Sequence, residues 1–150
     1  MSPVAVGHVR RGGAAALGTA LAVALATALG ACGELTSADL FLLQRSGSAP
    51  GARLTLLVNE GGVVHCNGGP PLAISDELLV QARGIQEDLR SAASAHLSLP
   101  ARAGSVLSYY LRDPDGTVRF ADNSAKQPHV LRELADFTLR VAQGVCRLPM

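Results

Sequence analysis

Hydrophobic and polar residues alternate over several short stretches of the chain after residue 38, and two longer stretches show a helical period instead. Alternation at every second residue is typical of strands with one buried face, whereas apolar residues three and four apart indicate an amphipathic helix. We therefore predict two helices, at about 76–94 and from Pro128 to about Val145. The predicted strands are residues 39–44, 53–58, 63–66, 105–112 and 117–121.

Each predicted helix carries one apolar stripe. Ser75 is a suitable N-cap for the first helix, and Pro128 suits the first turn of the second. Gly84 interrupts the first helix, which suggests that a strand approaches it closely. The stripes consist of Leu78, Ala82, Ile85, Leu89 and Ala92 in the first helix, and of Val130, Leu134, Phe137, Val141 and Val145 in the second.

Turn-forming residues separate the predicted strands. Residues 59–62 and 113–116 have the composition of hairpin turns, because glycine accepts a positive φ and proline fixes φ near the turn value. Residues 67–71 are interpreted as a break between elements. The resulting order, β-β-β-α-β-β-α, predicts an α+β fold with an antiparallel sheet of about five strands and both helices packed on one face.

The first 31 residues follow a different pattern. Arg10 and Arg11 precede an uncharged, alanine-rich run over residues 14–29, as in a secretory signal peptide. The run ends in Leu29-Gly30-Ala31-Cys32, which is similar to the lipobox at which bacterial lipoproteins are cut and acylated. We expect a signal peptide (1–31), a tether (32–38) and a single domain (39–150). An uncleaved membrane anchor is the alternative for the apolar run.

The chain has three cysteines, Cys32, Cys66 and Cys146. An odd number in an exported protein leaves one thiol to be explained. If Cys32 carries a diacylglyceryl lipid, the other two can form a disulfide outside the reducing cytosol. Two free thiols, or a Cys66 that binds a metal, are the alternatives to a Cys66–Cys146 disulfide.

The charge of the chain and the spacing of its histidines, cysteines and aspartates argue against several classes of function. The chain has a formal charge of +1, which becomes −1 once the leader with its two arginines is removed, so we expect no nucleic-acid partner. His65 and Cys66 are adjacent on a predicted strand and point to opposite faces, and His96 and His129 lack the spacing of metal ligands. Residues 113–116 lack the further oxygen ligands of a calcium loop. We therefore expect no catalytic residue, no metal site and no cofactor other than the lipid on Cys32.

Tyr109 and Tyr110 are the candidate contact residues. Because they are neighbours on a predicted strand, one must face the core and the other the open side of the sheet. An exposed tyrosine there would be a suitable contact for a partner.

The sequence resembles two families of proteins. The lipobox, residues 61–71 and 115–120, and Cys146 resemble the small exported lipoproteins of GC-rich Gram-positive bacteria, which implies lipid anchoring at the outer face of the cell membrane. Residues 45–47 and 51–54, with the tyrosine-rich strand, hairpin and terminal helix, also resemble the emfourin-like inhibitors of thermolysin-type metallopeptidases. The sequence thus predicts a membrane-anchored, non-catalytic domain that binds an envelope protein or a secreted peptidase. A peptidase inhibitor and a small envelope enzyme are the alternatives.

Overall fold

The computed structural model describes residues 38–148, so the predicted leader, the box at 29–32 and nearly all of the tether lie outside the described residues. The described residues belong to one compact unit. In chain order the elements are β1 (Asp39–Gly47), β2 (Leu54–Asn59), β3 (Val63–Cys66), β4 (Pro71–Ala73), α1 (Asp76–Ser94), β5 (Leu107–Asp113), β6 (Gly116–Ala121) and α2 (His129–Gly144).

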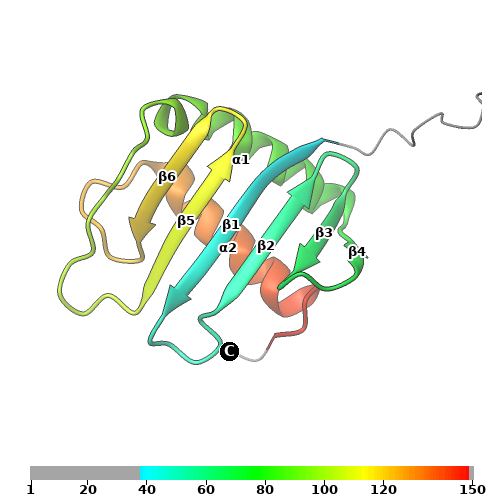
Figure 1. The fold of residues 1–150 in the computed structure, drawn as a ribbon, viewed down its shortest axis with the longest axis horizontal. Coiled ribbons are helices and arrows are strands. Elements are labelled where there is room, and N and C mark those ends of the chain that lie inside the picture. Colours follow the sequence, from blue (N-terminus) through cyan, green and yellow to red (C-terminus); the bar gives the residue numbers. More distant parts are fainter. Residues whose placement is uncertain (1–37, 149–150) are drawn as a thin grey trace, which may run out of the picture. The chain divides into compact units, whose positions relative to one another are not determined.

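The strands form one antiparallel sheet in the order β4-β3-β2-β1-β5-β6. Figure 1 shows both helices on the same side, behind the sheet. The predicted α+β fold is therefore confirmed, with six strands in place of about five. The additional strand is β4, which falls at the edge of the segment interpreted as a break. Pro71 is tolerated there because an edge strand has one side that needs no partner for its N–H groups.

The helical stripes and the inward residues of the strands form one core. Phe41 of β1 meets Phe137 of α2 edge to face, with ring centroids 6.0 Å apart. Ser75 caps α1, because its Oγ accepts a hydrogen bond from the Leu78 N–H. The largest fully buried side chains are Phe41, Phe137, Leu40, Leu43, Leu56, Ile85, Leu89, Leu111, Leu131, Leu134, Val58 and Val64.

A disulfide joins the sheet to the last helix. Cys66 is the last residue of β3 and Cys146 follows α2 by two residues, and their Cα atoms are 5.9 Å apart. The predicted pairing is thus confirmed.

The expectation for Gly84 is wrong. A Cβ atom built on this glycine would meet nothing within 4 Å. The reason is helical phase: α1 buries Ala82 and Ile85, so Gly84 faces outward and no strand approaches it.

The edge strand β6 is covered by the segment that leads from α1 to β5. Arg119 N–H donates to Leu97 O, and Leu99 N–H donates to Arg119 O, at 2.8 and 2.9 Å. This parallel pairing satisfies backbone groups on β6 that would otherwise form an open edge.

Candidate functional site

The side of the sheet opposite the helices, here called the open face, carries the candidate site. Burial alternates along the central strands, with Leu43 buried while Gln44 is exposed in β1, and Leu111 buried while Arg112 is exposed in β5. Cross-strand pairing places Gln44 beside Tyr110 on this face. Its residues on β1, β2, β5 and β6 are Leu42, Gln44, Ser46, Thr55, Leu57, Ser108, Tyr110, Arg112, Thr117, Arg119 and Ala121.

A hollow of about 840 Å³, here called the groove, lies over the half of these strands furthest from residue 39. Its lining includes residues of β1, β2, β5 and β6 and none from either helix, which places it on the open face. The volume is in the range of small-molecule sites. The lining residues are Gln44, Arg45, Ser46, Arg53, Leu54, Thr55, Asn67, Leu99, Ala101, Ser108, Tyr109, Tyr110, Arg119, Phe120 and Ala121.

Three arginines line the groove, and no aspartate or glutamate does. Arg45 is buried, and its guanidinium donates to Ala52 O at 3.1 Å and to Gly51 O at 3.0 Å. It thereby holds the loop between β1 and β2. Arg53, at the end of this loop, and Arg119 of β6 are exposed. The groove is therefore a basic surface.

The two tyrosines divide between the two faces of the sheet, as alternation predicts. Tyr109 is 6% exposed and stacks on Phe120, with ring centroids 4.6 Å apart. Burial raises the pKa of its phenol, partly opposed by Arg45 and reinforced by Asp122 and Asp136. Tyr110 is half-buried on the open face.

Arg119 covers one face of the Tyr110 ring. The guanidinium carbon lies 4.8 Å from the ring centroid, and the two residues are direct partners across the β5–β6 hairpin. A cation held over an aromatic face is attracted by the ring quadrupole. The pairing therefore positions the Arg119 charge at the groove, a role that the sequence pattern alone does not predict.

A smaller hollow of about 430 Å³ adjoins the other half of the open face. Leu42, Leu57 and Arg112 belong to its lining, as do Asp39 and Asp113. Leu42 and Leu57 are direct cross-strand partners and are half-buried. They provide an apolar contact next to the basic groove.

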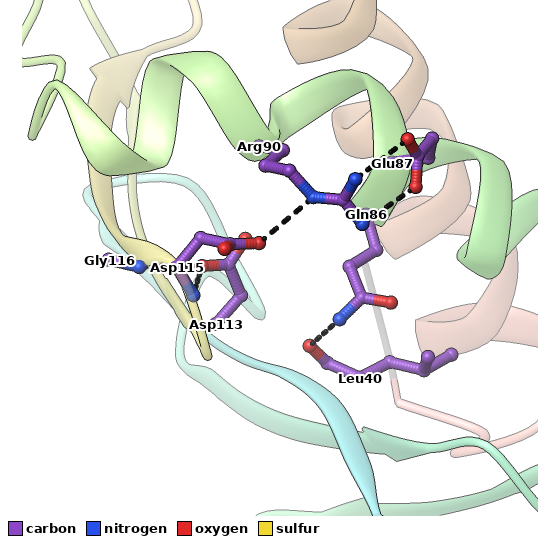
Figure 2. Close-up of polar contacts among 7 residues, drawn as sticks. All are labelled: Leu40, Gln86, Glu87, Arg90, Asp113, Asp115 and Gly116. Atoms are coloured by element: carbon purple, nitrogen blue, oxygen red, sulfur yellow. Dashed lines mark hydrogen bonds and ion pairs between the residues drawn. The ribbon is translucent and has the colours of Figure 1, made fainter.

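The turn between β5 and β6, whose Asp113 and Pro114 line the second hollow, is fixed to α1 (Figure 2). Asp113 Oδ1 accepts hydrogen bonds from the N–H groups of Asp115 and Gly116, at 2.9 and 2.8 Å. Arg90 of α1 contacts Asp115 and also pairs with Glu87. In the part of the chain that the structure describes, these aspartates therefore act as turn and anchoring residues.

None of the three described histidines lines the groove, and each has a different contact. His65 Nδ1 is 2.9 Å from Gly69 O, His96 Nδ1 is 3.1 Å from Thr117 Oγ1, and His129 Nδ1 is 3.0 Å from Glu133 Oε1. Within residues 38–148 no group of three or more His, Cys, Asp or Glu side chains could hold a metal ion.

Asp122 supports the rim of the sheet beside the groove. Its carboxylate accepts hydrogen bonds from Ser105 Oγ at 2.7 Å and from Val106 N–H at 3.2 Å. Partial burial raises the pKa of Asp122, but these bonds and those with the backbone of Asn123 and Leu107 outweigh it, and the net pKa is lowered from 3.8. The ionised carboxylate thus holds the segment that leads into β5.

Neither of the described helices is long and apolar enough to cross a membrane. In comparisons with protein-family models, with curated proteins and with solved structures, nothing matches this chain.

Proposed function

We propose that the chain is an exported lipoprotein whose domain binds a macromolecular partner of the cell envelope through the open face. In this proposal Leu29, Gly30 and Ala31 form the cleavage box, and a diacylglyceryl group on Cys32 anchors the domain to the outer face of the cell membrane. Tyr110 is a partner contact, and the domain carries no catalytic residue.

The observation that carries the proposal is the one-sided covering of the sheet. Both helices pack on one face (Figure 1), and the other face keeps a basic groove of about 840 Å³ that no part of residues 38–148 fills. A hollow on a rigid sheet, lined by arginine, tyrosine and amide side chains, has the composition of a recognition site.

The position of the groove is compatible with a short anchor. The tether has six residues after Cys32, which can span at most about 20 Å. Ser46 lies seven residues along β1 from Asp39, which corresponds to about 23 Å of strand. The groove therefore lies at the end of the sheet away from the tethered residue, where a partner can reach it.

The binding claim is tested by photo-crosslinking in intact cells. A photoreactive amino acid in place of Ser108, which lines the groove, should give a discrete adduct. The same replacement at Ser91, exposed on α1, is the control and should give none. Adducts at neither position, or equal adducts at both, would contradict the proposal. An adduct with a thermolysin-type peptidase would favour the inhibitor alternative.

The anchor claim is tested by Cys32→Ala. The variant should accumulate as a larger precursor or leave the membrane fraction, because it has no thiol to acylate, whereas Ser37→Ala should behave as the wild type. Unchanged size and membrane retention of Cys32→Ala would refute acylation.

A further inference from the structure

We infer that the segment bound by the open face is an acidic peptide that also carries apolar side chains, lying across β2, β1, β5 and β6. This inference rests on the proposed function and names its partner class. Four observations carry it: the charge of the groove, the covered tyrosine ring, the adjoining leucine pair and the width of the site.

The charge of the groove selects an anionic ligand. Arg53 and Arg119 are exposed at the groove, and no carboxylate lines it. Arg112 extends the positive charge toward the second hollow, whose lining also includes the carboxylates of Asp39 and Asp113. Arginine forks pair bidentately with carboxylates, and a cluster of them without counter-charges favours an acidic partner.

One face of the Tyr110 ring is not available for stacking, because the Arg119 guanidinium carbon lies 4.8 Å from the ring centroid. A ligand that approaches this face meets the oriented guanidinium and not the aromatic surface that a sugar or a nucleobase would need. Arg119 can keep this position while its outward N–H groups pair with a carboxylate.

The leucine pair distinguishes a peptide from an anionic polymer. Leu42 and Leu57 lie side by side on the open face, one alternation step along β1 from Gln44 at the groove. A phosphate polymer or an anionic glycan has no side chain to bury there. An acidic peptide with an aliphatic residue satisfies both the arginines and the leucines.

The width of the site sets the length of the segment. Four neighbouring strands from β2 to β6 span three inter-strand spacings, or about 14 Å, which accommodates about four residues of extended chain.

The test is a fluorescence anisotropy titration of the full-length protein in detergent micelles. The probe is a labelled peptide of about eight residues in which glutamate and leucine alternate. This is about twice the number of residues that the width of the site accommodates. Arg53→Gln and Arg119→Gln should each weaken binding about tenfold, whereas Arg132→Gln, on the outer side of α2, should leave it unchanged. Replacing the glutamates of the peptide by glutamine, or its leucines by serine, should each weaken binding, as should added salt.

Several outcomes would overturn the inference. The first is that the peptide does not bind. The second is that Arg132→Gln weakens peptide binding as much as the groove variants do. The third is that polyphosphate or polygalacturonate binds more tightly than the peptide and that this binding depends on Arg119. Because Arg53 lies outside the strands, Arg53→Gln still tests whether the groove arginines bind the peptide even if Arg119→Gln unfolds the sheet. If the Ser108 adduct forms in cells but the peptide does not bind, this inference alone fails. If no adduct forms, the proposed function fails.

Discussion

Gly84 and Gly116 differ in whether their positions could accept a side chain. Gly84 lies in the exposed face of α1, where a Cβ would meet nothing within 4 Å. Gly116 begins β6 with φ +154°, and a Cβ there would lie 2.2 Å from Ala93 O. The first glycine is a helix-weakening residue with no packing role, whereas the second allows the β5–β6 turn to contact the end of α1.

We predict that Gly84→Ala raises the free energy of unfolding by about 1 kcal/mol, because alanine is the better helix former and costs less chain entropy. Gly116→Ala should lower it by about 2 kcal/mol or more, because the clash and the positive φ must both be relieved. Urea unfolding of both variants measures this. Destabilisation by Gly84→Ala would mean that this face of α1 is in contact.

Asp122 gives a prediction for pH dependence. Its folded pKa lies below the 3.8 of the unfolded chain, so its ionised form stabilises the fold. This contribution is fully present above about pH 4 and is lost as the pH falls through the folded pKa. Asp122→Asn should therefore lower stability at neutral pH, and its difference from the wild type should shrink in acid. A difference that stays constant from pH 7 to about pH 2 would contradict the assignment.

Individual residues of the site differ in how well the sequence predicts them. Alternation along one strand is enough to send one of Tyr109 and Tyr110 to each face. To predict that Arg119 lies beside Tyr110, the register of the β5–β6 hairpin must be known. The turn at 113–116 in principle sets this register, in which Tyr110 and Arg119 are partners. Arg53 and Arg45 could not be placed, since they reach the groove only through the pairing of β1 with both β2 and β5.

At the scale of elements, the helices are the most predictable parts of the chain. The stripe and the Ser75 cap predict 76–94, and α1 is Asp76–Ser94. Strand ends are less predictable because partners decide them. β1 continues to Gly47 since Ser46 and Gly47 pair with Ser108 and Leu107. The sequence pattern does not predict the three-residue β4, because its proline signals a break and only its pairing with β3 makes it a strand.

The disulfide is the strongest single tie between elements. It closes a loop of 80 residues between β3 and the end of α2, which on the loop-entropy account contributes about 4–5 kcal/mol. In urea unfolding, the Cys66→Ser, Cys146→Ser double variant should have a free energy of unfolding that is lower by this amount. The reduced wild type should be as unstable as the double variant. Thiol reagent should label neither cysteine in denatured, unreduced protein. Labelling of either one would show that the bond is absent from the isolated protein.

At the scale of the whole molecule, the open face follows from topology. The central position of β1 joins the β1–β4 half of the sheet to the β5–β6 hairpin, and both helices cross the same side (Figure 1). The sequence predicts the layers, because amphipathic helices must cover one face. It does not predict the strand order or the groove, because both depend on the long-range contact between β1 and β5.

Binding of the partner by the basic open face can be tested by combining the photoreactive residue with a reversal of charge. The yield of the Ser108 photo-adduct is compared in intact cells carrying Arg119→Glu or Arg132→Glu, two equal reversals of charge on opposite layers of the domain. We predict that Arg119→Glu abolishes the adduct and that Arg132→Glu leaves its yield unchanged. Equal yields in both variants, with both proteins folded and membrane-bound, would show that the partner does not bind through the basic open face.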